Sequence, residues 1–223
     1  MSKILAVNYC SKHIGMMLQT VDKNIDQLKV GDSVNFNQII KHTTLMIICK
    51  ILFGQDIEDN MPTGLYINPD TFEQSQMRFD ELFSKVVADE FRYSAGPMAN
   101  FFPILAYNNL INPQKTSRKN IDECKRVILE FSQKSADKDS VYNLLKSYNS
   151  SEEEKMSEEE LILDVVVMLF AGFDTSSYAI ISLLYQLKMN PDKLQRLKVT
   201  LDESKITQID ELSKPEQKEA YQN

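Results

Sequence analysis

The chain has 223 residues, of which 43% are hydrophobic and 26% charged, and its formal net charge at neutral pH is −7. This composition is typical of a globular protein with one core, and the scarcity of Gly and Pro favours helix. The negative charge argues against nucleic acid as a partner, because nucleic-acid-binding proteins present basic patches. Cys10, Cys49 and Cys124 form no paired motif, so we expect reduced thiols.

Apolar residues recur at helical spacing along most of the chain. Lone histidines, His13 and His42, have no second ligand at metal spacing, so no metal site is expected. The predicted elements are one or two helices over 4–28, a helix from Asn35 or Asn37 to Phe53 with Gly54 as its left-handed C-cap, a polar loop over 57–70, helices over 72–93, 118–132 and 139–148, and a helix from 191 to about 201. The polar residues 202–223 are expected to hold a short helix near 209–212 and a frayed tail.

One stretch, from Ser157 to Lys188, stands out by its length and its apolar character. It opens with a capping box, in which Ser157 and Glu160 would each accept a hydrogen bond from the other's amide. The residues that follow are apolar on nearly every face up to Phe173, which predicts a helix buried all round. Two aspartates inside the stretch, Asp164 and Asp174, make a membrane span unfavourable, because each carboxylate at mid-membrane costs about 3 kcal/mol.

The middle of this helix breaks the apolar pattern. Gly172 costs about 1 kcal/mol of helix propensity relative to Ala, and a buried Asp174 is unfavourable without a partner. The residues Val167, Phe170, Ala171, Asp174 and Thr175 share one helical face. Thr175 can donate to the carbonyl of Ala171, which bends helices and opens a groove. A hydroxyl and a carboxylate beside an apolar groove suit proton delivery.

Ala171-Gly172-Phe173-Asp174-Thr175-Ser176 resembles the oxygen-activation motif of the cytochrome P-450 family, the haem-thiolate monooxygenases. Asn190-Pro191-Asp192 follows where the next helix of that family begins, and the helix ending in Phe53-Gly54 resembles the family helix that packs behind the motif. The resemblance implies an all-α fold: a single partial P-450-like domain over residues 1–223, containing the distal half with the long central helix, with packed helices over about 1–201.

The resemblance also implies roles for residues of this chain. Asp174 and Thr175 would be catalytic, with Thr175 hydrogen-bonding dioxygen and Asp174 relaying protons to it. Ala171, Gly172 and Thr175 would face the cofactor, haem b, and Val167 and Phe170 an apolar substrate. An electron-donating reductase would be the protein partner. Residues 72–132 would form a lid whose loop, 98–107, either contacts a membrane or is buried under neighbouring helices.

Three family features are missing from these residues: the Phe-x-x-Gly-x-x-x-Cys-x-Gly loop with the iron ligand, a Glu-x-x-Arg pair on the helix expected after the tail, and any Trp. None of the three cysteines lies in a loop suited to an iron thiolate. We therefore expect a chain that is inactive alone, either a partial monooxygenase or, alternatively, a non-enzymatic all-helical interaction module or decayed fragment. Residues 1–10 show no signal peptide or anchor, so the chain as written is expected to be soluble. The family suggests the cytoplasm or the cytosolic face of the endoplasmic reticulum membrane.

Overall fold

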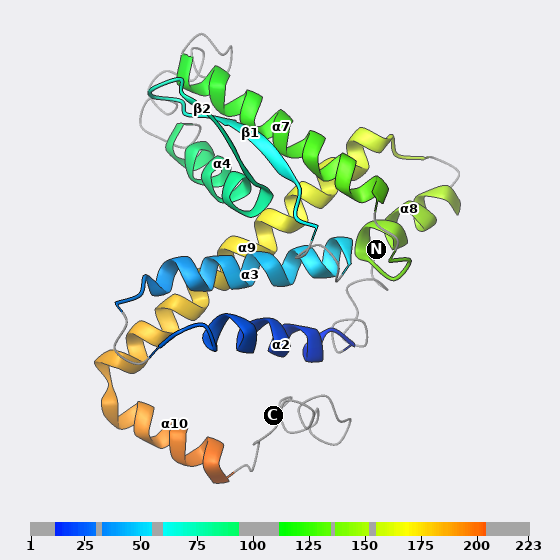
Figure 1. Cartoon of the computed structure of the whole chain (residues 1–223). Helices are drawn as coiled ribbons and strands as arrows, with labels where there is room; N and C mark the ends of the chain where they lie inside the picture. The colour runs from blue at the N-terminus through cyan, green and yellow to red at the C-terminus, as the bar shows by residue number, and fades with distance from the viewer. Residues whose placement is uncertain are drawn as a thin grey trace. The chain divides into compact units, whose positions relative to one another are not determined.

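A computed structural model describes residues 12–29, 33–54, 60–93, 112–134, 137–151 and 155–203. The described chain is mainly helical, with one two-stranded antiparallel sheet (Figure 1), so the predicted helical fold class is confirmed. Its elements are α2 (Ile14–Ile25), α3 (Phe36–Phe53), β1 (Thr63–Ile67), β2 (Gln74–Arg78), α4 (Phe79–Tyr93), α7 (Asn112–Lys134), α8 (Val141–Ser151), α9 (Glu158–Met189) and α10 (Pro191–Glu203). The predicted short helix and frayed tail after residue 203 lie outside the described residues.

The chain divides into two compact units. The first contains residues 1–51 and 171–223, and the second contains residues 52–170. Accordingly, α2, nearly all of α3, the second part of α9 and α10 belong to the first unit. The hairpin, α4, α7, α8 and the first part of α9 belong to the second. That all 223 residues form a single domain stays a prediction.

The predicted helix ends are confirmed where side chains cap them. The Ser157 hydroxyl accepts from the Glu160 amide at 3.3 Å, and the Glu160 carboxylate accepts from the Ser157 amide at 2.7 Å. These hydrogen bonds from Ser157 lower the pKa of the Glu160 carboxyl. The Asn35 side chain accepts from the Gln38 amide at 3.3 Å at the start of α3. Gly54 follows α3 with φ +107°, the left-handed backbone expected of a C-cap glycine.

The β-hairpin corrects the sequence prediction at two places. β1 lies within residues 57–70, which were predicted as a loop, and β2 occupies the start of the helix predicted over 72–93, so that α4 begins only at Phe79. The strands pair in antiparallel register, with Thr63 opposite Arg78 and Ile67 opposite Gln74. Each strand has five residues, and in β2 Met77 alone is buried. Strands this short carry too little alternation to be told from loop or helix by their own pattern.

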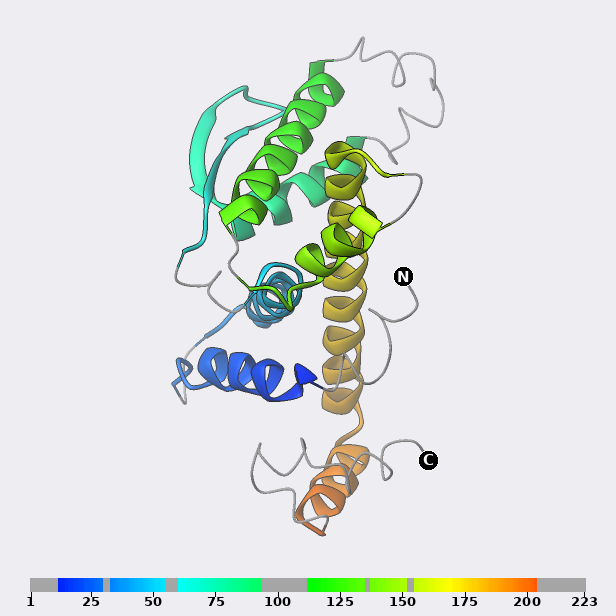
Figure 2. The same cartoon turned by 90° about the vertical axis from the view of Figure 1, so that its right-hand side faces the viewer.

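Long-range contacts to α7 hold the hairpin in place (Figures 1 and 2). The Asn120 side-chain amide bonds both backbone groups of Ile67, accepting from its N–H at 3.0 Å and donating to its C=O at 2.8 Å. The Glu123 carboxylate accepts from the Leu65 N–H at 2.9 Å. These side chains therefore form hydrogen bonds with the backbone groups on the edge of β1 that faces away from β2. On an exposed edge strand such groups would have no protein partner.

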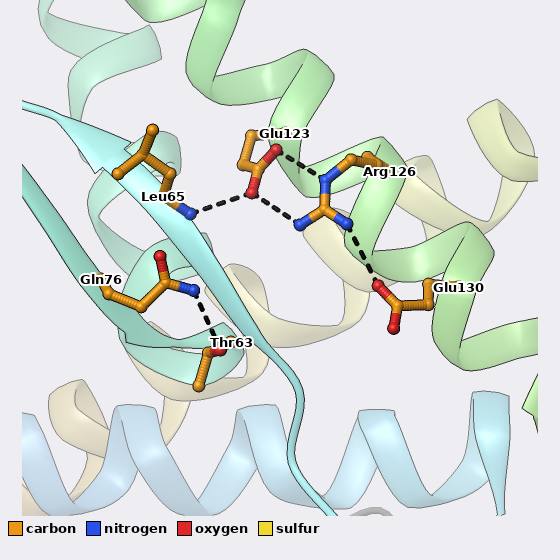
Figure 3. Close-up of polar contacts among 6 residues, drawn as sticks. All are labelled: Thr63, Leu65, Gln76, Glu123, Arg126 and Glu130. Atoms are coloured by element: carbon orange, nitrogen blue, oxygen red, sulfur yellow. Dashed lines mark hydrogen bonds and ion pairs between the residues drawn. The ribbon is translucent and has the colours of Figure 1, made fainter.

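An ion-pair chain along α7 orients the carboxylate that caps this edge (Figure 3). Arg126 donates two hydrogen bonds of 2.8 Å to Glu123 and a third, of 3.1 Å, to Glu130. The guanidinium lowers the pKa of the Glu123 carboxyl, so the capping group is ionised at neutral pH. Gly64 lets β1 pack closely on both α4 and α7, because a Cβ there would lie 2.6 Å from the Leu82 side chain and 2.9 Å from that of Val127.

We predict that Asn120→Ala lowers the free energy of unfolding by about 2 kcal/mol, since it leaves the Ile67 N–H and C=O without their partner. Asn120 is 1% exposed, so water cannot readily replace its amide. Urea unfolding followed by circular dichroism measures the change. The control is Lys119→Ala, at the exposed neighbouring position on α7. An Asn120→Ala midpoint equal to that of the control would contradict the proposed edge cap.

Candidate functional site

The predicted motif lies in the middle of α9 (Glu158–Met189), which runs through it as one continuous helix. The Thr175 hydroxyl donates to the Ala171 carbonyl at 2.6 Å, as predicted from their spacing. Ala171 and Thr175 are exposed and Asp174 is half-buried, whereas Phe173 is buried. The acid and the hydroxyl therefore lie on an accessible side of the helix.

The prediction that this helix is buried all round is wrong. Apart from Ile162, its buried residues recur every four positions from Leu161, through Val165, Leu169 and Phe173, to Ser177. On another side, Leu163 is 50% exposed, Val167 57% and Phe170 38%. The other described elements thus cover one side of α9 and leave the side with the predicted site residues open. The prediction was wrong because apolar residues on every face of a helix do not show whether other elements pack against each of those faces.

Gly172 has a packing role that sequence reasoning missed. A Cβ at this position would lie 2.9 Å from the Ile48 Cδ1 and 3.2 Å from its Cγ1, so the Ile48 side chain would have to move to make room for it. The glycine therefore lets α9 pack tightly on α3, within the first unit. This contact explains why a residue of low helix propensity stands mid-helix. That Gly172 also faces a cofactor stays a prediction.

We predict that Gly172→Ala lowers the free energy of unfolding by about 1 kcal/mol, because the clash with Ile48 outweighs the gain in helix propensity. Ile48→Val removes the Cδ1 atom, so the two substitutions together should be less destabilising than their sum by about 0.5 kcal/mol or more. The matched control is Gly15→Ala on α2, where a Cβ meets nothing within 4 Å. Equal effects of Gly172→Ala and Gly15→Ala in thermal unfolding would contradict the close packing.

A second aromatic residue accompanies Phe170 in the second unit. The rings of Phe91, on α4, and Phe170 have centroids 5.6 Å apart at an interplanar angle of 38°. Phe91 is 52% exposed, so the pair forms an accessible apolar contact rather than part of the core. The sequence places Phe91 on the apolar side of its helix, but it gives no signal that links it to Phe170.

No metal-ligand cluster of three or more His, Cys, Asp or Glu side chains occurs among the described residues. Two of the cysteines, Cys49 and Cys124, are buried, at 0% and 2% exposed. Burial raises the pKa of the Cys124 thiol to about 12. A thiolate ligand has to be deprotonated and reachable, so neither thiol suits an iron atom. Cys10 lies outside the described residues.

We predict that iodoacetamide at pH 8 alkylates Cys49 and Cys124 at least about a hundredfold more slowly in the native chain than in guanidinium chloride. Both thiols are buried, and the raised pKa of Cys124 leaves little thiolate to react. Peptide-resolved mass spectrometry gives the rate at each cysteine. Native rates close to the denatured ones would show that these thiols are accessible and would reopen the question of an iron ligand.

Of the described helices, α9 is long and apolar enough to cross a membrane, with a mean hydropathy of 1.6 over its most apolar window. Length and composition do not separate a span from the core helix of a soluble protein. Asp164 and Asp174 lie inside this helix and disfavour a lipid environment.

The family model for cytochrome P450 matches residues 2–214. The match includes α9 and its motif together with every other described element. The chain therefore belongs to the cytochrome P450 family, as its motif predicted.

Among curated proteins, the chain is 25% identical to cytochrome P450 3A12 of Canis lupus familiaris over 180 residues, or 77% of this chain and 34% of that protein. It is 26% identical to human cytochrome P450 1A1 over 210 residues, or 87% of this chain and 37% of that protein. The chain thus matches about a third of the length of these relatives. No solved structure matches significantly.

Proposed function

We propose that the open face of α9 is the distal wall of a haem site in a P450-type monooxygenase, and that the iron ligand comes from residues outside these 223. The observation that carries this proposal is the exposure of Ala171 and Thr175 in a long, mostly apolar helix, within a chain that belongs to the family. The reaction would insert one oxygen atom of dioxygen into an apolar organic substrate.

The described residues fit one side of a haem. Ala171 offers a small, exposed side chain against which a flat apolar group can lie, and Thr175 lies one turn further along. They do not provide the iron ligand, because Cys49 and Cys124 are buried thiols. Haem, when bound, would supply the redox chemistry that activates dioxygen. The family places Gly172 on this wall as well, although its bare side meets Ile48.

Within this site, Thr175 and Asp174 would handle protons. The Thr175 hydroxyl donates to the Ala171 carbonyl, which fixes its hydrogen and leaves its oxygen lone pairs free to accept. Half-buried Asp174 is adjacent in sequence and can exchange protons with water. Because α9 holds both on a rigid element, little reorganisation is needed to use them.

The substrate would meet an apolar surface. Val167 and Phe170 are the family-predicted contacts, and Phe91 extends this surface through its ring contact with Phe170. Exposed apolar groups of this kind are stabilised when a ligand removes them from water, by about 25 cal/mol per Å². An apolar substrate therefore fits this wall better than a charged one.

The remaining family-based roles are part of the same proposal. Electrons would come from a reductase, and the protein would act in the cytoplasm or at the cytosolic face of the endoplasmic reticulum membrane. The loop proposed for membrane contact, 98–107, lies outside the described residues. The proposal also holds that these 223 residues alone would be inactive, because neither described cysteine is an accessible thiolate for the iron.

The test uses the purified chain with methyl-labelled Ala and Thr. Ferric haem is paramagnetic, so we predict that it broadens the methyl signals of Ala171 and Thr175 in NMR spectra. Thr200, exposed on α10 and far along the chain from the motif, should keep its line width. The Ala171→Arg variant, which fills the flat wall, should reduce haem binding at least about tenfold, and Thr200→Arg serves as the control.

The iron ligand is tested on the same samples by reducing them and adding carbon monoxide. We expect no thiolate-type Soret band, because no accessible thiolate is described. A thiolate-type band would contradict a ligand from outside these residues. Absence of haem binding, or broadening elsewhere, would overturn the distal wall itself and favour the alternative, a non-enzymatic helical module.

A further inference from the structure

The last residues of α4, 89–93, are held by polar side chains from outside the helix. Tyr66, on β1, donates a hydrogen bond to the Asp89 carboxylate at 2.8 Å. Ser117, on α7, donates to the Glu90 carboxylate at 3.1 Å. Two further residues at the end of α4 bind the turn that joins the strands of the hairpin. The hairpin and α7 thus fix the end of α4, all within the second unit.

Asp70, in the turn between β1 and β2, joins the two residues that end α4. Its carboxylate accepts from the Tyr93 hydroxyl at 2.6 Å and from the Arg92 guanidinium at 2.9 Å. The hydrogen bond from Tyr93 lowers the pKa of the Asp70 carboxyl, while burial and this same bond raise the pKa of Tyr93 to about 12. At neutral pH the acceptor is therefore ionised and the donor protonated. Exposed ion pairs contribute little, whereas a short O–H···O⁻ bond is strong, so Tyr93 is the more important partner.

The turn itself holds Asp70 in place. The Asn68 side-chain oxygen accepts from the Asp70 N–H at 2.9 Å and from the Thr71 N–H at 3.2 Å. The Asn68 carbonyl accepts from the Phe72 N–H at 2.9 Å, which closes the turn. Asp70 therefore binds α4 from a backbone that is already fixed by hydrogen bonds.

Phe91 lies among these fixed residues, and its ring contacts that of Phe170 on α9. Both rings are exposed, so packing on every side does not confine them. Their contact depends instead on where α4 and α9 place them. Helix ends fray unless they are tied down, and Phe91 is in the last turn of its helix. The hydrogen bonds at the end of α4 therefore decide whether the two rings stay together.

We propose that Asp70 is a positioning residue that holds the Phe91 ring against that of Phe170 and so fixes this part of the proposed substrate wall. It acts through Tyr93 and Arg92 and is not required to touch the substrate. That a substrate meets the two rings rests on the proposed function, whereas the contact between the rings does not.

NMR of the full 223-residue chain with ¹³C-labelled Phe tests the ring contact. Phe91→Leu and Phe170→Leu identify the cross-peak between the two rings. Asp70→Ala should weaken this cross-peak at least about threefold, because the last turn of α4 then opens locally. Tyr93→Phe, which keeps the ring and loses the hydroxyl, should weaken it in part. Adding Tyr93→Phe to Asp70→Ala should then have little further effect, since both remove the same bond.

The matched control is Glu73→Ala, an exposed acid of the same hairpin whose carboxylate accepts from Thr71. It should leave the cross-peak unchanged. A cross-peak of full intensity in Asp70→Ala, or one that Glu73→Ala weakens as much, would overturn the positioning role. Urea midpoints of all variants separate loss of the contact from loss of the fold.

Toluene, as an apolar aromatic probe, connects this contact to the proposed wall. We expect it to shift the ring signals of Phe91 and Phe170, and Asp70→Ala to weaken its binding about threefold, with Glu73→Ala unchanged. Equal toluene affinity in Asp70→Ala would refute the claim that Asp70 shapes the wall. A ring contact that requires Asp70 in a chain that binds no toluene would support the positioning role and count against the proposed substrate wall.

Discussion

The rest of the structure depends on the one-sided burial of α9. Val165, Leu169, Phe173 and Ser177 recur every four residues and are all but fully buried, and the first three anchor the helix by apolar contact. Each anchored turn fixes the orientation of the residues on the other sides. Because the helix is continuous from Glu158 to Met189, this burial also holds Ala171, Asp174 and Thr175 on an accessible side.

This arrangement divides the unusual residues of the motif by role. Gly172 is required by the approach of Ile48, a steric constraint from α3. Thr175 satisfies its hydroxyl within the helix, at the Ala171 carbonyl, and so needs no outside partner to be stable there. Asp174 is half-buried, and no contact among the described residues accounts for an aspartate at this position, as expected of a residue kept for chemistry. A packing requirement and a proposed catalytic one therefore stand side by side in the same turn of helix.

In the second unit, polar side chains form hydrogen bonds with a strand edge that has no neighbouring strand. β1 has a partner on one side only, and the amide of Asn120 and the carboxylate of Glu123 take the place of a neighbour on the other. Arg126 holds that carboxylate by a pair of hydrogen bonds, so the cap is oriented by charge rather than by packing. Since the hairpin contains so few residues, its stability rests on α7 more than on its own pairing.

The sequence by itself determined the helices, their capped ends and the family. The Ser157–Glu160 box, the Asn35 cap and the Gly54 C-cap act within a few residues of each other, so their chemistry can be read locally. The Thr175–Ala171 hydrogen bond was predictable for the same reason. The tertiary structure alone decided the hairpin, the contact of Phe91 with Phe170 and the reason for Gly172. It also decided which side of α9 is open. Each of these depends on residues distant in sequence, and a periodic apolar pattern says that a face will be buried without saying what buries it.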